Sequence, residues 1–403
     1  MVNFDSNILL GDLLLEYPEV KMVFSVNGLN EFDDEEYVSK IGPFLRLETI
    51  LKMKHINPDI FYKELEEKII ETNFGDKGIS VSNDRLNMLS LLPCPLKLPI
   101  QAEFESCFSD LSLDGKDFNY LIDGNANNQI SFFPYVDYFN SIDDIPDIVI
   151  SSGVNSFYYR HFINNFIDKG YFVDTADYLP NQQLRDVGIK DPGGNYTVIS
   201  MNILVMVIDN GKIGDRSIPE KWGDLLEPEF EKEVAIRGKN NLFCETTLLT
   251  IFKQHGIDGI QKLGRAVKYG WHPSQMAKAA GNGRLEAPTI SIMPYFFTRT
   301  IKNKENVTVV WPKDGAIISP VTMLVKKTKA KSLKPVIDFF NGDVVGNICA
   351  NANFPSINPK VNNKIAPDTQ FNWLGWDFIK QNDIGNLVDY LNSEFLKSFE
   401  QGE

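Results

Sequence analysis

The sequence predicts an α/β protein of two lobes that follows a small all-α N-terminal domain. Two long apolar stretches carry the two-lobed prediction: residues 196–209 follow an Asp-Pro-Gly-Gly turn at 191–194, and residues 316–325 follow a Pro-Lys-Asp-Gly turn at 312–315. Apolar, β-branched runs that begin at Pro and Gly are typical of buried strands. Two such strands let the chain leave one lobe, build a second lobe and return to the first.

The composition limits both the number of domains and the class of partner. A chain of 403 residues is too long for one ordinary core, and 43% hydrophobic with 23% charged residues is typical of a globular protein. The net charge is −14, and no basic patch stands out. We therefore expect two or three domains, and neither nucleic acid nor a polyanionic membrane surface as a partner.

The first residues do not resemble an export signal. They include no early Lys or Arg, and the apolar run Ile8-Leu9-Leu10 is interrupted by Gly11-Asp12. A signal peptide needs a basic start and a longer apolar stretch, and a membrane span needs about 18 or more consecutive apolar residues. We expect a cytoplasmic protein without membrane insertion.

Cysteine and histidine spacing argues against a metal or redox centre. The sequence contains no Cys-x-x-Cys pair, and its histidines are scattered without ligand spacing. In a reducing cytoplasm such cysteines are free thiols. We expect no metal site and no cofactor. The residues concerned are Cys94, Cys107, Cys244, Cys349, His55, His161, His255 and His272.

Residues 1–75 are predicted to form the helical accessory domain. Leucines at positions 9, 10, 13 and 14 give an apolar face at helical spacing, and Pro18 ends this first helix. Residues 73–82, rich in Gly and polar side chains, are the expected linker. Further helices are expected at 21–26, 44–53 and 58–71.

A family resemblance in this segment rests on residues 8–14, Tyr17-Pro18, Val23-Phe24 and Gly28. The segment resembles a small helical domain of unknown function that is often found with redox-disulfide and hybrid-cluster proteins. Members of that family often carry cysteines shortly after the glycine, whereas the next four residues here are Leu, Asn, Glu and Phe. The resemblance implies a docking or accessory module rather than a redox centre.

The rest of the chain alternates between strand and helix patterns, which is typical of α/β lobes. We expect residues 84–195 and 317–403 to form lobe one, and residues 196–316 to form lobe two. Strands are expected at 86–92, 130–136, 147–150, 234–236 and 290–295, and helices at 100–108, 157–169, 219–226, 246–255, 296–302, 334–340, 344–350 and 373–399.

Two loops place small polar groups at the start of an expected helix. An anion can be held there by backbone N–H groups and hydroxyls. The alternative is ordinary capping of the helix by the same side chains. The candidates are Ser151, Ser152, Gly153 and Asn155 in lobe one, and Glu245, Thr246 and Thr247 in lobe two.

Aromatic and thiol side chains add further candidate ligand contacts. Trp271, His272 and Tyr295, with Tyr269 nearby, are suited to stack on an organic solute or a cation, although core packing is the alternative. Cys94 lies between two prolines in an expected loop, and Cys244 precedes Glu245. The alternative for both cysteines is a small buried residue.

Three sequence motifs then carry a resemblance to a known family. Residues 219–229 read Pro-x-x-Trp-x-Asp-Leu-Leu-x-Pro-Glu, residues 311–316 read Trp-Pro-Lys-Asp-Gly-Ala, and helix patterns follow at 335–340 and 343–351. Residues 84–400 resemble type II periplasmic substrate-binding proteins of ABC transporters, closest to the branch that binds ferric iron, thiamine, polyamines and phosphonates. The resemblance implies two lobes that close on a small-molecule ligand by a hinge motion, and a transporter as partner.

The expected ligand is a small anionic or zwitterionic solute, because two helix starts carry the polar groups. Ferric iron is an alternative. Ferric binders of this family use adjacent tyrosines near Pro294, where this chain has Tyr295-Phe296, and its Tyr158-Tyr159 pair lies in lobe one. A docking partner recruited through residues 1–75 is a further expectation.

The sequence favours a binding protein over an enzyme. It contains no Gly-x-Ser-x-Gly, no His-Glu-x-x-His and no phosphate-binding Gly-Lys-Ser motif. A cysteine-dependent enzyme or sensor that combines Cys94 or Cys244 with His272 is the remaining alternative.

Overall fold

The computed structural model describes residues 7–27, 29–58, 61–62, 64–65, 69, 86–108, 112–113, 116–124, 133–180, 182–239 and 241–400. The chain divides into two compact units. Unit 1 comprises Met1–Ser151, His161–Val173 and Leu324–Ser332, and unit 2 comprises Ser152–Arg160, Asp174–Met323 and Leu333–Glu403. These units group the residues differently from the three predicted domains, whose boundaries stay a prediction.

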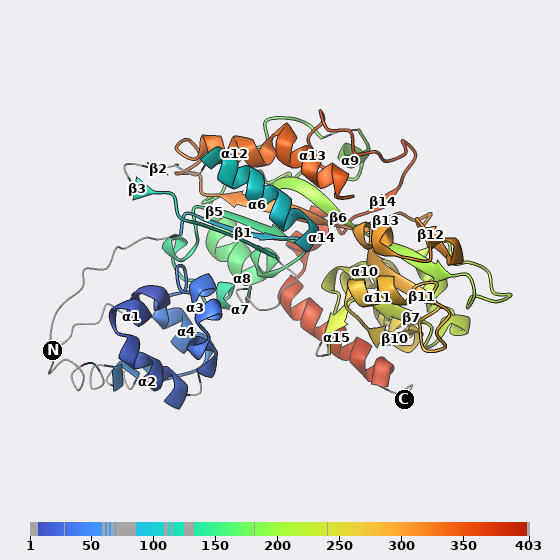
Figure 1. Ribbon diagram of the computed structural model, residues 1–403, viewed down its shortest axis with the longest axis horizontal. Helices are drawn as coiled ribbons and strands as arrows, with labels where there is room; N and C mark the ends of the chain where they lie inside the picture. Colours follow the sequence, from blue (N-terminus) through green and yellow to red (C-terminus); the bar gives the residue numbers. More distant parts are fainter. Residues whose placement is uncertain are drawn as a thin grey trace. The chain divides into compact units, whose positions relative to one another are not determined.

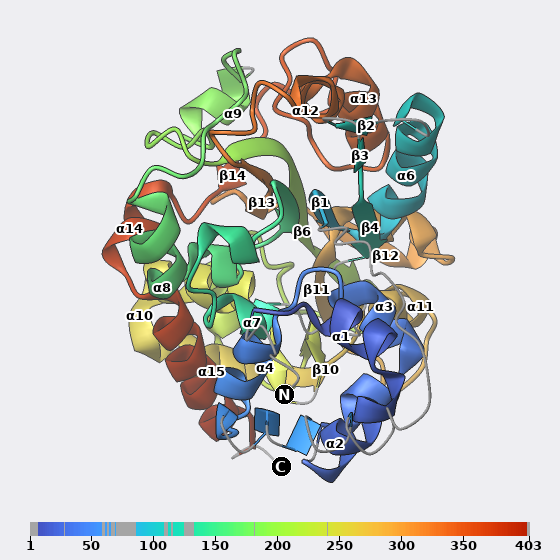
Figure 2. The same ribbon diagram turned by 90° about the vertical axis from the view of Figure 1, so that its left-hand side faces the viewer.

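The N-terminal part of unit 1 is helical, as the apolar spacing predicted (Figure 2). We call its described residues, from 7 to 69, the helical module. Its rings form a core of their own, in which Phe24 lies 5.6 Å from Phe32 and 5.2 Å from Phe61 between centroids. The helices are α1 (Leu10–Glu16), α2 (Lys21–Val26), α3 (Glu35–Ile41) and α4 (Leu47–Met53).

The other part of unit 1 has an α/β arrangement (Figure 1). Strand β1 (Met88–Leu92) pairs in parallel with both β4 (Tyr120–Gly124) and β5 (Ile148–Ser152). Helix α6 (Cys94–Phe108) follows β1, and α7 (Phe133–Val136) lies between β4 and β5 in the chain. Because parallel strands share their direction, the carboxyl ends of β1 and β4 meet at one edge of the sheet.

Unit 2 is organised around a five-strand stretch of sheet in the order β10-β7-β11-β6-β13. The two long strands predicted from the sequence, β6 (Thr197–Asp209) and β13 (Ala316–Val325), pair antiparallel. The other three, β7 (Val234–Ile236), β10 (Val267–Gly270) and β11 (Ile290–Pro294), run parallel to one another. Short strands β12 (Val307–Val310) and β14 (Phe371–Asn372) pair with β6 and β13 respectively.

Helix α10 (Glu245–Ala266) is the longest helix of unit 2 within the described residues, and it runs beside α15 (Ile384–Glu400) in Figures 1 and 2. The two helices approach closely at Gly264, where a Cβ would lie 2.6 Å from the carbonyl oxygen of Phe395. Gly256 takes φ +62° inside α10 and bends it, because a left-handed residue interrupts the helix.

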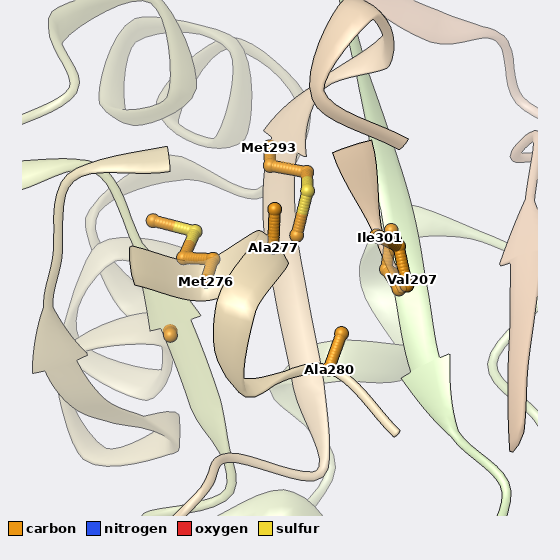
Figure 3. Close-up of a cluster of buried hydrophobic side chains, with 7 residues drawn as sticks. Val207, Met276, Ala277, Ala280, Met293 and Ile301 are labelled. Carbon is orange, nitrogen blue, oxygen red and sulfur yellow. The ribbon is translucent and has the colours of Figure 1, made fainter. Parts of the chain in front are cut away.

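One hydrophobic core cluster of unit 2 lies between the sheet and α11 (Pro273–Ala279) (Figure 3). Seven buried side chains form this cluster, and they come from three strands, from α11 and the residue that follows it, and from the segment after β11. Tyr269, Trp271, Phe297 and Val307 pack against it and remain partly exposed. The buried members are Val207, Ala235, Met276, Ala277, Ala280, Met293 and Ile301.

Several predicted elements are wrong, each for a local reason. Residues 133–136 form α7 and not the end of a strand, because Pro134 cannot donate to a β-ladder yet fits a first helical turn. The helix predicted at 373–399 is interrupted by extended backbone at Asn382, which separates α14 (Trp376–Gln381) from α15. The linker predicted at 73–82 lies outside the described residues.

The helices predicted at 219–226 and 296–302 are 3-10 turns at Trp222–Leu226 and Tyr295–Thr300. Pro228 disfavours helix at the residue before it, which stops the first of them after one turn. In contrast, α12 (Lys334–Asn341) and α13 (Asp343–Asn351) confirm the predicted tail helices. The predicted α/β fold class is therefore confirmed. The errors concern one strand end that is a helix, and the type and length of several helices.

Candidate functional site

The carboxyl ends of three parallel strands in unit 2 bring most of the candidate residues of predicted lobe two to one edge. Strands β10, β7 and β11 are neighbours in the sheet and end at Gly270, Ile236 and Pro294. Trp271-His272 follow the first, the segment leading to α10 follows the second, and Tyr295 follows the third. Ligands of α/β proteins bind outside the carboxyl ends of parallel strands, so this edge is the candidate site.

Backbone hydrogen bonds hold two of these segments together around the end of β7. Trp271 N donates to the carbonyl of Ile236, and Cys244 N donates to the carbonyl of Arg237, both at 2.9 Å. The short hairpin of β8 (Gly238–Lys239) and β9 (Leu242–Phe243) joins β7 to α10. Predicted contacts that are far apart in the sequence, at 244–247 and at 271, therefore share one sheet edge.

The N-terminus of α10 keeps polar groups that the fold itself does not use. Its N-cap residue, Cys244, makes no side-chain capping bond. Thr247 is fully buried, and its Oγ1 has no hydrogen-bond partner within the described part of the chain. By contrast, the Thr250 hydroxyl donates to the carbonyl of Thr246 at 2.7 Å. A helix N-terminus with unused donors attracts an anion.

Glu245 opens α10 with a carboxylate that would repel an anion. Arg237 Nη2 lies 2.7 Å from Glu245 Oε2, so this charge is paired. Both side chains are more than a third exposed, at 45% for Arg237 and 37% for Glu245. The pair therefore leaves little net charge at the helix end and places a guanidinium next to it.

The aromatic candidates beside this edge are half-buried. The Tyr269 and Trp271 rings stack with centroids 4.3 Å apart and an interplanar angle of 10°, and both pack on the core cluster of Figure 3. Tyr295 meets Trp311 edge-on at 5.6 Å. Tyr269 and Trp271 therefore pack on the core and also remain partly exposed, so core packing and exposure to a solute are compatible for these two rings.

His272 caps a helix. It is exposed at the N-cap of α11, where its Nδ1 lies 2.8 Å from Ser274 Oγ and accepts from Ser274 N at 3.2 Å. The imidazole is therefore committed to α11, and a solute contact by His272 stays a prediction.

The loop predicted to hold an anion from lobe one is built differently from expectation. Ser151 and Ser152 end β5 and are buried, and Gly153 takes φ +82°. Asn155 accepts from Phe157 N at 3.1 Å and donates to the carbonyl of Gly153 at 3.3 Å. Asn155 is therefore a capping residue, as the alternative interpretation held.

What Asn155 caps is a 3-10 turn at Ser156–Tyr158, followed by only short helical segments, and not the helix predicted at 157–169. The loop consequently lacks the dipole of a long helix. Solute contact by Ser151, Ser152, Gly153 or Asn155 stays a prediction.

The candidate cysteines differ in exposure. Cys94 is exposed and is the first residue of α6, not part of a loop, whereas Cys244 is 7% exposed. Cys349 is also buried, which raises the pKa of its thiol to about 12. The described residues contain no disulfide.

Tyr158, one of the tyrosines considered as iron ligands, is used by the fold. Tyr158 is fully buried, its hydroxyl lies 3.0 Å from Thr322 Oγ1, and its ring stacks on Tyr196 at 5.1 Å. Burial raises the pKa of the Tyr158 phenol above its usual range. Over the described ranges no three His, Cys, Asp or Glu side chains gather as a metal site would require.

Sequence reasoning missed a charged group in unit 1. Asp123, 2% exposed, lies near the carboxyl end of β4, and its Oδ1 accepts from Lys97 Nζ at 2.6 Å and from Gly124 N at 2.7 Å. Burial would raise the pKa of this carboxyl, but these two bonds, with the charge of Lys40, outweigh burial and lower it. The pattern Tyr-Leu-Ile-Asp-Gly at 120–124 was the available signal, an apolar strand that ends in a carboxylate.

Comparisons with known proteins agree with this architecture. Residues 143–382 match the family model of a bacterial extracellular solute-binding protein. No curated protein matches the chain. Within the described ranges no helix is both long and apolar enough to cross a membrane.

Solved structures share the fold at low sequence identity. A protein described as a two-component system protein that mediates signal transduction is 17% identical, with a TM-score of 0.54 over 76% of this chain and 100% of that chain. IdiA (FutA) of Trichodesmium, solved with iron and citrate, is 12% identical, with a TM-score of 0.52 over 79% of this chain and 98% of that chain. The ferric binding protein of Campylobacter jejuni is 13% identical, with a TM-score of 0.51 over 79% of this chain and 99% of that chain.

At such identities these structures establish the fold and nothing more. The family match is of a different kind, because it covers more than half of the sequence and includes β5, β6, α10 and β13. The chain therefore belongs to the family of bacterial extracellular solute-binding proteins.

Proposed function

We propose that the solute is a small anionic or zwitterionic molecule whose acidic group binds at the N-terminus of α10. The observation that carries the proposal is the buried Thr247 hydroxyl, which has no partner among the described residues, at a helix start whose N-cap side chain makes no capping hydrogen bond. First-turn N–H groups and hydroxyls are the donors that a carboxylate or phosphonate accepts from.

The surroundings support an organic solute with more than one recognition group. The Arg237 guanidinium lies near the helix end, and the partly exposed Tyr269, Trp271 and Tyr295 rings follow strands of the same sheet edge. An aromatic face attracts either an apolar group or an ammonium. Because Thr247 is fully buried, any group that bonds its hydroxyl is itself enclosed by protein when bound.

A thermal-shift panel tests the charge class of the solute. Small carboxylates, phosphonates and amino acids are compared with neutral sugars and diamines on the full chain. A true ligand at about 100-fold over its Kd stabilises the fold by roughly 2.7 kcal/mol. We expect shifts only from anionic or zwitterionic members, whereas shifts confined to neutral or purely cationic compounds contradict the proposal.

Ferric iron is the second candidate, because two structures with this fold are described as iron-bound or ferric binding. Tyr295, which is half-buried and directly follows β11, is the phenolate that would take part. Iron binding to a phenolate produces a visible charge-transfer band. Addition of ferric citrate to wild type and to Tyr295→Phe therefore distinguishes this candidate from the anionic solute.

We further propose that the protein delivers its solute to an ABC transporter and that it is cytoplasmic. Both parts of the proposal rest on sequence features alone. The family supports a small-molecule ligand. Fractionation of the native host cell after crosslinking tests both parts. Recovery with a membrane permease would support the transporter role, and recovery in the cytoplasmic fraction would support the location.

A further inference from the structure

Two ion pairs join the helical module to the α/β part of unit 1. Arg46, just before α4, contacts the Asp144 carboxylate, and Lys40 Nζ in α3 lies 3.6 Å from Asp123 Oδ2. In both pairs the base belongs to the module and the acid belongs to the α/β part. The two acids are nearly buried, with 3% and 6% of their side chains exposed for Asp123 and Asp144.

Each carboxylate divides its two oxygens between the two parts. Asp144 Oδ2 accepts from Asn140 N at 2.9 Å and from Ser141 N at 2.8 Å, and its Oδ1 faces Arg46. Asp123 Oδ1 accepts from Lys97 and Gly124, as described above, while its Oδ2 accepts no hydrogen bond within the described ranges and faces Lys40.

How each carboxylate shares its oxygens determines how much stability the α/β part would lose if the module separated from it. A buried carboxylate left without any partner is strongly destabilising. Here each carboxylate retains two local hydrogen bonds after its module partner leaves, so the α/β part does not depend on the module for its polar balance. The module in turn has its own aromatic core.

The contact region between the two parts is polar and incompletely filled. A cavity of about 190 Å³ lies between them, and all its lining residues are polar or charged. Figure 2 shows α4 beside α7, and the hydroxyl of Tyr37 in α3 lies 3.4 Å from that of Tyr135 in α7. Polar interfaces inside one chain allow relative motion of the parts. The lining residues are Asn7, Arg46, Glu48, Thr49, Asn140, Ser141, Asp143 and Asp144.

We propose that Lys40–Asp123 and Arg46–Asp144 form a latch that docks the helical module reversibly on the α/β part of unit 1. One end of the latch lies at the carboxyl end of β4, and the other lies just before the amino end of β5. The module therefore bridges opposite ends of parallel strands, and opening the latch changes the surface of this sheet without unfolding it.

Hydrogen–deuterium exchange of the full chain tests the latch. In the double variant Lys40→Met with Arg46→Met, exchange is expected to rise at least 10-fold in α3, α4 and α7, and to stay unchanged in β1 and β5. The matched control is Lys52→Met, which removes an ion pair with Glu48 inside α4 and leaves the latch intact. The control is expected to exchange like wild type.

Two outcomes overturn the proposal. Unchanged exchange in the double variant means that the ion pairs do not hold the module. A rise that extends equally into β1 and β5 means that the module is an integral part of the fold and not a docked one.

A salt series on wild type needs no variant. Ionic strength weakens partly exposed ion pairs. Exchange in α3, α4 and α7 is therefore expected to rise between 0.05 and 1 M NaCl, and an absence of salt dependence contradicts an electrostatic latch.

Discussion

Two strand-end regions differ in whether their buried polar groups have partners. One is the carboxyl end of β4 in unit 1, and the other is the edge of unit 2 formed by the carboxyl ends of β10, β7 and β11. In unit 1 the buried Asp123 carboxylate accepts from Lys97 and Gly124 and faces Lys40. In unit 2 the start of α10 keeps an uncapped helix end and the Thr247 hydroxyl without a partner in the described part of the chain.

This contrast separates structure from function. Buried polar groups in folded proteins are almost always hydrogen-bonded, so an unsatisfied one needs an explanation. At Asp123 the nearby charges complete the fold, and removing them costs stability. At Thr247 we propose that a solute supplies the missing partner, so removing the hydroxyl is expected to cost binding.

The largest expected effect is a loss of stability on removal of the Asp123 carboxylate, which tests its structural role. Asp123→Ala removes a buried acceptor of two hydrogen bonds and leaves Lys97 without its partner, so the free energy of unfolding is expected to fall by about 2 kcal/mol. Urea denaturation measures this change. Asp338→Ala is the control, because its pair with Lys334 is exposed and is worth about 0.5 kcal/mol or less. Equal losses in both variants would show that the Asp123 group has no special structural role.

The pH dependence of stability tests the same carboxylate without removing its volume. The pKa of Asp123 is lowered in the folded state. The ionised Asp123 carboxylate therefore stabilises the folded state fully above the unfolded-state pKa of about 4. This contribution is lost as the pH falls through the lower pKa of the folded state. The difference in Tm between wild type and Asp123→Asn is expected to be constant from about pH 7 to 5 and to shrink below about pH 4. A difference that persists unchanged at about pH 2 would contradict this.

Two threonines one turn apart in unit 2 are expected to change the free energy of unfolding in opposite directions, by less than Asp123→Ala does. Thr247→Val removes an unsatisfied buried hydroxyl, so the solute-free protein is expected to gain about 1 kcal/mol, whereas Thr250→Val loses its bond to Thr246 and is expected to lose about 1 kcal/mol. Both changes are nearly isosteric. Thermal unfolding of both variants without solute measures the signs, and a loss of stability in Thr247→Val would mean that its hydroxyl does have a partner within the protein.

Thiol labelling is expected to have the smallest effect on binding. Cys94 and Cys107 are exposed and should react with a disulfide reagent at about pH 8, whereas Cys244 and Cys349 are buried and should react only after denaturation. Cys94 is the first residue of α6 and is not part of the strand ends and helix start on which the proposed solute site is built, so we expect labelling it to leave solute affinity unchanged. A loss of affinity would favour the cysteine-dependent alternative.

Much of the fold could be predicted from the sequence because the long strands are strongly apolar. Residues 197–209 and 316–325 are almost entirely buried, and their composition shows it directly. The family resemblance added the connection between them and is confirmed by the match over residues 143–382. The resemblance of the N-terminal segment to a helical domain, the two-lobe closure and the cytoplasmic location stay predictions.

Helix type could not be predicted in the same way. The apolar spacing at 157–167 suits an α-helix, but the structure forms a 3-10 turn, a short α-helix and a π segment, because Asn155 caps the first turn and Tyr158 bonds Thr322, distant in sequence. The Asp123 group escaped prediction for a related reason. Its partners, Lys40 and Lys97, come from segments that only the tertiary fold brings together.

Native mass spectrometry of the protein as purified is the most direct test of the claim that a solute binds at the start of α10. Three proteins are compared, each with its own denatured mass: wild type, the double variant Thr246→Val/Thr247→Val, and Thr250→Val. The account predicts an extra small-molecule mass on wild type and on Thr250→Val, and its loss or strong reduction in the double variant. The same extra mass at equal occupancy on all three proteins would show that the solute does not bind at the start of α10.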